Sequence, residues 1–145
     1  MTKETIENNP IVKHSFEFAL MVNQYSSKLR EMNYWDLARQ LFKSGTSIGA
    51  NVWESQNGES TSDFVHKMKI AAKEANETLF WLMLCDNAPE YPDCKPLLAK
   101  LDEIQRLLSS IISTTKRNNP LNFFIGHILF LLKPTTTAVL FDKLS

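Results

Sequence analysis

Cysteine, glycine and β-strand patterning are all scarce in this sequence, and each scarcity excludes a class of protein. Two cysteines, Cys85 and Cys94, are too few for the disulfide framework of a small secreted domain or for a four-cysteine zinc site. We interpret both as reduced thiols. Only four glycines and six prolines occur, and the prolines fall mostly between periodic segments, as they do in helical proteins. No segment alternates polar and apolar residues over a sustained length, so we expect no β-sheet.

The sequence also lacks an excess of charge and a long hydrophobic run. Lys plus Arg and Asp plus Glu number sixteen each, so any binding to nucleic acid or to an anionic membrane must come from a local patch. The first residues are polar and contain no apolar core of a signal peptide, which favours the cytoplasm. The longest apolar run, 121–132, is too short for a bilayer that needs about twenty residues. We therefore expect it to dock on its own domain or on a neighbouring subunit, with no membrane contact.

Helical periodicity divides the chain into three parts. Residues 1–9 are polar and predict a flexible arm, residues 10–117 contain the periodic segments, and residues 118–145 form an apolar tail for which the pattern predicts no definite structure. Helices are predicted at 10–32, at 34–55, from about 60 to the two-proline turn at 88–93, and at 95–116. Because the connections are short, we predict an all-α, antiparallel up-down-up-down four-helix bundle with an extra apolar C-terminal segment.

The predicted helices have recognisable ends and inward-facing stripes. Asn9 and Pro10 suit the start of the first helix, Gly58 suits a left-handed residue after the second, and Ser60 suits the cap of the third. The residues expected to face inward are Ile11, Phe18, Val22, Tyr25, Leu29 and Met32, with Phe16, Leu20 and Met21 beside them; Ala38, Leu41, Gly45, Ile48 and Val52, with Leu37 and Phe42 beside them; Phe64, Met68, Ala71, Ala75, Leu79 and Leu82; and Leu97, Leu101, Ile104, Leu108 and Ile111.

The second predicted helix contains an unusual stretch of small residues, "SGTSIGANVWES" at 44–55. Gly45 and Gly49 lie four residues apart and therefore on one side of the helix, where each costs about 1 kcal/mol of helix propensity relative to alanine. With Ser44, Ser47 and Ala50 they form a surface of little bulk. We therefore predict that another helix packs closely against it.

This stretch, followed by "STSDFVHKMKIAAKEANETLFWL" at 60–82, resembles the central signature of the bacterial four-helix-bundle proteins of intervening sequences within 23S ribosomal RNA genes. The resemblance extends over about 10–117. It implies a bundle that assembles into a ring-like homo-oligomer, a pentamer in typical members, whose biochemical role is mostly undetermined.

A related branch of this family, the accessory variability proteins of retroelements, works beside a reverse transcriptase and binds nucleic acid through a basic surface. Here Phe42 and Lys43 stand where the family often has consecutive basic residues, which weakens the case for nucleic-acid binding.

A polar row on the second predicted helix is the first candidate site. Ser47, Asn51 and Glu54 share one side of that helix and could bind a ligand or partner, or could fix the register against the next helix or a neighbouring subunit. We favour the structural role. Lys43, Lys73 and Glu74 are the expected ionic partners across the second and third predicted helices, and the sequence does not say which pairs form. Trp53 and Trp81 are large amphipathic side chains of the kind found at interfaces, and we assign at least one to a subunit contact. The predicted interface residues are Gly45, Ser47, Gly49, Asn51, Trp53, Glu54, Glu74 and Trp81.

The remaining candidate is a basic group at His66, Lys67, Lys69 and Lys73. With Lys43, its lysines are the predicted nucleic-acid contacts, although Asp63, Glu74 and Glu77 nearby favour an ordinary solvated surface.

Catalytic and metal-binding patterns are missing from the sequence. A two-iron bundle needs two Glu-x-x-His pairs, whereas His14-x-x-Glu17 has the reverse order and occurs once. We predict no metal, no cofactor and no small-molecule substrate. The prediction is a non-enzymatic, self-assembling scaffold or accessory protein; the alternatives are an RNA- or DNA-binding accessory subunit acting beside a nucleic-acid enzyme and, third, a metalloenzyme.

Overall fold

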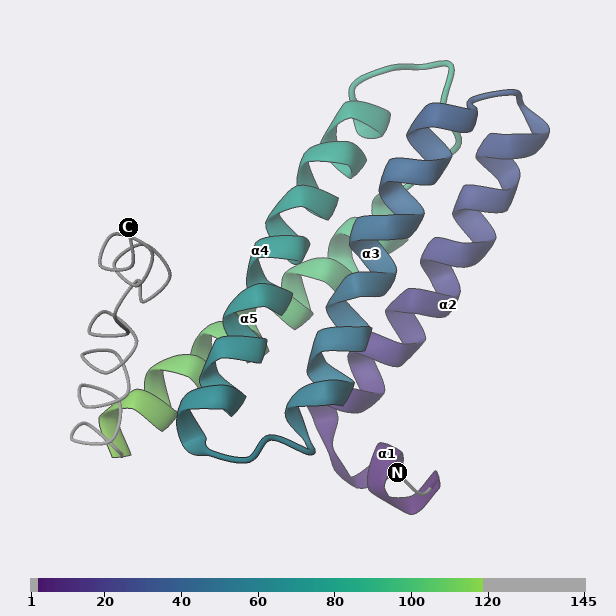
Figure 1. The fold of residues 1–145 in the computed structure, drawn as a ribbon. Helices are drawn as coiled ribbons and strands as arrows, with labels where there is room; N and C mark the ends of the chain where they lie inside the picture. Colours follow the sequence, from purple (N-terminus) through teal and green to yellow (C-terminus); the bar gives the residue numbers. More distant parts are fainter. Residues whose placement is uncertain (1–2, 119–145) are drawn as a thin grey trace, which may run out of the picture.

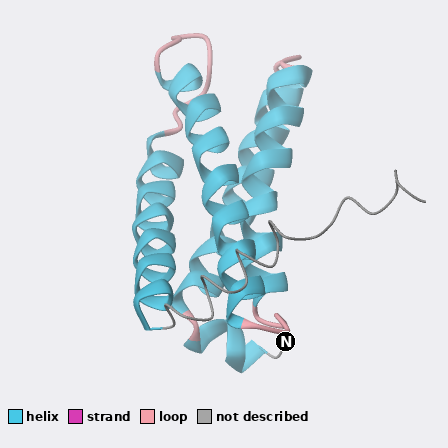
Figure 2. Cartoon of the chain, turned by 60° about the vertical axis from the view of Figure 1, so that its left-hand side comes forward, coloured by secondary structure: helices cyan, strands magenta, loops and turns pink. Residues whose placement is uncertain are grey.

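The computed structural model describes residues 3–118, and every regular element among them is a helix (Figure 2). The helices are α1 (Lys3–Asn8), α2 (Pro10–Glu31), α3 (Trp35–Ser55), α4 (Thr61–Asp86) and α5 (Lys95–Asn118). The predicted all-α bundle is confirmed, and α2 to α5 match the four predicted helices closely. The apolar tail at 119–145 lies outside the described residues.

The four long helices run antiparallel to their neighbours in chain order (Figure 1). The α2–α3 turn and the α4–α5 loop lie at one end of the bundle, and the α3–α4 connection lies at the other end with α1. Each long helix packs on the next, and α5 returns to pack on α2, which closes the bundle.

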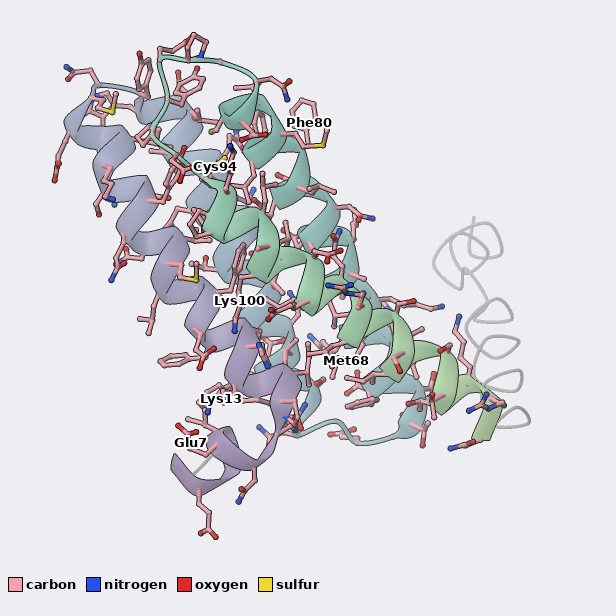
Figure 3. All side chains as sticks on the ribbon, turned by 180° about the vertical axis from the view of Figure 1, so that it is seen from behind. Glu7, Lys13, Met68, Phe80, Cys94 and Lys100 are labelled. Atoms are coloured by element: carbon pink, nitrogen blue, oxygen red, sulfur yellow. The ribbon has the colours of Figure 1, made fainter. Side chains whose placement is uncertain are left out.

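The first residues differ from the predicted flexible arm, because Lys3–Asn8 form the short helix α1, which packs on α2. Ile6 is half-buried against the core, and Lys13 Nζ on α2 lies 2.7 Å from the carboxylate of Glu7. Both charged side chains can be followed at the N-terminal end in Figure 3. A single apolar anchor in a polar segment gives too weak a periodic signal to predict this helix.

The helix ends follow local chemistry, with one exception. Ser60 caps α4, since its Oγ accepts a hydrogen bond from the backbone N–H of Asp63 at 3.1 Å. Asn9 precedes Pro10 as predicted, but its side-chain nitrogen donates to Gln56 Oε1 at 2.9 Å instead of capping α2. The left-handed conformation predicted for Gly58 is wrong. Among the described residues, Asn33 between α2 and α3 has the positive φ, 66°.

The core lies between the four long helices and consists mainly of the predicted stripes. Its fully buried large side chains are Val12, Phe18, Val22, Leu29, Leu41, Ile48, Val52, Met68, Leu82, Leu101, Ile104 and Leu108. Each contributes about 1.5–3 kcal/mol by leaving water. Four residues placed in or beside the inward stripes are instead exposed: Phe16, Leu20, Met32 and Phe42.

The glycines of α3 are where α2 comes close, as predicted. A methyl group on Gly45 would lie 2.8 Å from both γ carbons of Val22, and one on Gly49 would lie 3.2 Å from the carbonyl oxygen of Ser15. Both distances are shorter than an ordinary carbon contact. The lost helix propensity is therefore offset by close packing between α2 and α3.

Polar contacts hold the other side of α2 against α5. Lys100 Nζ lies 2.7 Å from the carboxylate of Glu17 and 2.6 Å from His14 Nδ1, and His14 Nδ1 lies 3.4 Å from Glu103. Lys100 can be seen on α5 beside α2 in Figure 3. The hydrogen bond from Lys100 holds the pKa of Glu17 below its usual value. At the other end of the bundle, Tyr25 Oη donates to the Pro92 carbonyl at 2.7 Å.

Cys85 at the end of α4 and Cys94 in the α4–α5 loop are both free and buried. Burial raises the pKa of the Cys94 thiol to about 11 and raises that of Cys85 as well. Neither thiol is therefore ionised near neutral pH, which argues against a nucleophilic role.

Candidate functional site

Exposed apolar side chains gather on the outer side of α2 and α3. We call this the α2–α3 face; its members are Phe16, Leu20, Trp35, Phe42 and the half-buried Trp53. Phe16 and Leu20 lie one turn apart on α2 and are 46% and 50% exposed. On α3, Trp35 is 60% exposed, and Phe42 follows it two turns later on the same side of the helix. Scattered apolar residues are normal on a surface, but a row of aromatic side chains on one face indicates a contact surface.

A groove of about 270 Å³ lies within the α2–α3 face, and the small residues of α3 create it. Its lining residues are Ser15, Phe16, Ala19, Thr46, Gly49, Ala50 and Trp53. The rings of Phe16 and Trp53 both line it and contact each other, with centroids 6.4 Å apart. Gly49 lets the backbone of α2 come close at Ser15, and Gly49 and Ala50, having little or no side chain, line the hollow beside the two rings.

A second apolar surface lies on α4, on a different side of the molecule. We call it the α4 face; it consists of Phe80, Met83, Leu84 and the half-buried Trp81. Phe80 is 59% and Met83 52% exposed, and Phe80 points outward from the bundle in Figure 3. The rings of Phe80 and Trp81 meet edge to face at 4.9 Å, and Trp81 Nε1 lies 3.5 Å from Glu77 Oε1. Trp53 and Trp81 therefore each belong to one of the two apolar faces.

The polar row of α3 makes one bond to another helix. Glu54 reaches α4 through an ion pair with Lys67, at 2.6 Å, and this hydrogen bond raises the pKa of Lys67. Lys43, Lys73 and Glu74, which were predicted as ionic partners across these two helices, form no ion pair within the described residues. Asn51 Nδ2 donates to the Ser47 carbonyl and Ser47 Oγ to the Lys43 carbonyl, both bonds within α3.

Glu74 lies half-buried on α4, and its backbone carbonyl accepts a hydrogen bond from Thr78. Of the predicted polar interface residues, Glu54 is the one that bonds from α3 to α4.

The predicted basic group is divided between two surroundings. Lys67 faces Glu54, whereas Lys69 is turned toward α5, where burial and then the neighbouring charge of Lys116 lower the pKa of Lys69. Lys73, one turn further along α4, is exposed. Lys43 lies on α3 and lines a hollow with Trp35 and Phe42, at the edge of the α2–α3 face. These lysines therefore do not form one continuous basic surface.

The side chains considered for metal binding and catalysis have structural contacts. His14 and Glu17 both lie against Lys100, and within residues 3–118 no three His, Cys, Asp or Glu side chains gather as a metal would require. No helix of the described chain is long and apolar enough to cross a membrane.

These observations define the class of the molecule: an antiparallel four-helix bundle whose most distinctive surface features are two apolar faces. Residues 7–110 match the family model of the 23S rRNA-intervening sequence proteins. The chain therefore belongs to the 23S rRNA-intervening sequence protein family, as its sequence signature indicated. The apolar run at 121–132 lies outside the matched residues.

A solved structure supports the same assignment. It is a protein of unknown function of the S23 ribosomal protein family from Bacteroides thetaiotaomicron, with 37% sequence identity and a TM-score of 0.66. The similarity covers 70% of this chain and 97% of that protein. No curated protein matches the chain. Neither the family nor this neighbour points to a catalytic activity.

Periodicity alone does not identify the two apolar faces as surfaces. It predicts that Phe16, Leu20 and Phe42 lie beside the inward stripes, and it predicts no role for Phe80, Met83 and Leu84. One signal could have found them: on α2, apolar residues cover more of the helix than the side that a four-helix core can bury.

Proposed function

We propose that the protein is a non-enzymatic scaffold or accessory protein that works as a homo-oligomeric ring, with five subunits as the expected size. The observation that carries this proposal is the presence of two separate apolar faces on one chain, on α2–α3 and on α4. A two-fold dimer uses the same surface on both subunits, whereas a ring joins two different surfaces head to tail. The free, buried thiols fit a reducing compartment such as the cytoplasm.

The ring size comes from the resemblance to the family, and the pairing of surfaces comes from the side chains. Aromatic side chains with a polar edge, such as Trp53 and Trp81, are favoured in the centres of interfaces because they bury much area at little entropic cost. The groove beside Phe16 and Trp53 can accept a side chain such as Phe80 from a neighbouring subunit.

The test is to place a charge on each face separately, with Leu20→Lys and Phe80→Lys. Both residues are about half exposed or more, so the monomer should fold, while burying an unpaired lysine should weaken the subunit contact about 100-fold, or about 3 kcal/mol. Ser110→Lys, on the exposed side of α5, is the control of equal charge. Light scattering at micromolar concentration should give a multimer for the wild type and the control and a monomer for each variant.

Mixing the two variants distinguishes a ring from a two-fold dimer. The Leu20→Lys chain keeps an intact α4 face and the Phe80→Lys chain keeps an intact α2–α3 face, so together they should form one contact and stop at a heterodimer. Tryptophan fluorescence should change as this dimer forms. A monomeric wild type, or a Phe80→Lys variant that assembles normally, would contradict the head-to-tail proposal.

Nucleic-acid binding by Lys43, Lys67, Lys69 and Lys73 stays a prediction, and we rank it second. Lys69 beside Lys116 is the local feature in its favour. The ion pair of Lys67 with Glu54 and the balanced overall charge are the features against it.

A further inference from the structure

A groove of about 420 Å³ runs between α4 and α5 on a part of the surface that the proposed ring contacts do not use. We call it the α4–α5 groove; its lining residues are Ala72, Asn76, Gln105, Ser109, Ile112, Ser113 and Lys116. Gln105 Nε2 donates to Asn76 Oδ1 at 3.0 Å near one end, and Lys116 lines the other end. Alanine, serine and isoleucine between these ends leave a shallow trough whose small side chains allow a chain segment to approach closely.

The most apolar segment of the sequence begins five residues after Lys116, which lines one end of this groove. The stretch 121–132 is interrupted only by Asn122, Gly126 and His127. The described part of α5 reaches Asn118, and Pro120 follows two residues later in the sequence. Three residues span at most about 11 Å, so chain connectivity keeps Leu121 within about 11 Å of Asn118, which lies two residues beyond Lys116.

The length of the segment matches the length of the groove. From Gln105 to Lys116, α5 rises about 16 Å, and twelve residues cover about 18 Å as a helix and more when extended. An apolar run of this size is costly to leave in water and invites aggregation. A short tether gives it an effective concentration in the millimolar range or above at this groove.

We propose that the segment 121–132 docks in the α4–α5 groove of its own chain. This docking is compatible with the ring, because the groove ends at Asn76 and the α4 face begins one turn further along α4, at Phe80. The segment covers Ala72 and Ile112 and leaves the α4 face to a neighbouring subunit. This docking is a separate proposal from the ring assembly, and the experiments below test it independently of the ring.

Photo-crosslinking of the full-length chain tests the position of the segment. A benzophenone amino acid replaces Phe124, equal amounts of ¹⁴N- and ¹⁵N-labelled protein are mixed in the assembled state, and the cross-linked peptides are identified by mass spectrometry. The expected products join 121–132 to 69–76 or 105–116 within one isotopic chain. Cross-links to the α2–α3 face, mixed-isotope cross-links, or transfer of the label to added lipid vesicles would each overturn the proposal.

A pair of serine variants on α5 provides a second, independent measurement. Ser109 lines the groove and its neighbour Ser110 does not, although both are exposed. In hydrogen exchange, Ser109→Lys should speed exchange of the amides at 121–132 by about tenfold, whereas Ser110→Lys should leave it unchanged. Equal exchange in both variants would overturn the docking even if the ring assembles as proposed, and a monomeric protein with the expected cross-links would overturn only the ring.

Discussion

Gly45 leaves no room for a methyl group against Val22. Val22 is fully buried and β-branched, so it has one strongly preferred rotamer in a helix and cannot easily turn away. The same position would gain about 1 kcal/mol of helix propensity from alanine. Two opposing effects therefore meet at one residue, and their balance can be measured.

We expect Gly45→Ala to destabilise the protein by about 1 kcal/mol, because an overpacking cost of about 1–3 kcal/mol exceeds the gain in propensity. Urea unfolding measures the difference, with Ser47→Ala, on the half-buried outer side of the same helix, as the control expected within about 0.5 kcal/mol of the wild type. A Gly45→Ala protein more stable than the wild type would show that Val22 moves freely and that the contact is loose.

Residue type alone does not reveal such contacts. The spacing of Gly45 and Gly49 predicted a close approach, and α2 makes it. The sequence did not predict which atoms come close, because Val22 and Ser15 are opposed to the glycines only by the packing of α2 on α3. The same holds for Glu54, whose partner is Lys67 because of how α4 lies beside α3.

Helix α4 shows how far local signals determine an element. It runs from Thr61 to Asp86, and its start is set by Ser60, whose hydroxyl accepts the backbone N–H of Asp63. Asp63 also places a negative charge in the first turn, where it interacts favourably with the helix dipole. The Ser60 cap and the Asp63 charge can both be identified from the sequence, and the predicted start of α4 is confirmed.

Ser60→Ala should lower the stability by about 1 kcal/mol, since the N–H of Asp63 loses its acceptor at the helix end. Ser62→Ala, two residues later and exposed inside the first turn, is the matched control and should change little. Thermal unfolding of the two variants gives the comparison. Equal shifts in melting temperature would mean that water replaces the cap at no cost.

Helix α2 shows where the pattern fails. Phe16 and Phe18 are both aromatic and lie about 200° apart around the helix, so a broad apolar stripe cannot say which of them is buried. Phe18 is buried and Phe16 is about half exposed, because α3 and α5 cover one side of α2 and nothing in the described chain covers the other.

At the scale of the whole molecule, the packing of α5 on α2 closes the bundle, because it joins the last long helix to the first. Lys100 on α5 is mostly buried and lies between Glu17 and His14 of α2, with Glu103 also facing His14. The hydrogen bond from Lys100 lowers the pKa of Glu17 in the folded state. A carboxyl whose pKa is lower when folded stabilises the protein above its unfolded pKa, and this stabilisation is lost as the pH falls through the folded pKa.

Glu17→Gln should therefore cost a few tenths of a kcal/mol at pH 7, a small value because the Glu17 side chain is partly exposed to solvent. The difference between variant and wild type should shrink as the pH falls through the lowered pKa of Glu17, where its carboxylate becomes protonated. Urea unfolding between pH 7 and pH 3 measures it, with Glu31→Gln at the exposed end of α2 as the control. A difference that stays constant with pH would mean that packing, not charge, accounts for the loss.

The sequence by itself determined the helical class, the places where the long helices begin and end, and the family, because these depend on periodicity, capping residues and a local signature. Only the tertiary structure decided which sides of those helices remain uncovered, which charges meet, and that residues 3–8 form a helix against α2. The reason is physical: exposure and pairing depend on the positions of neighbouring helices, and residues distant in sequence set those positions. The two apolar faces and the α4–α5 groove, on which the proposals depend, are features of this second kind.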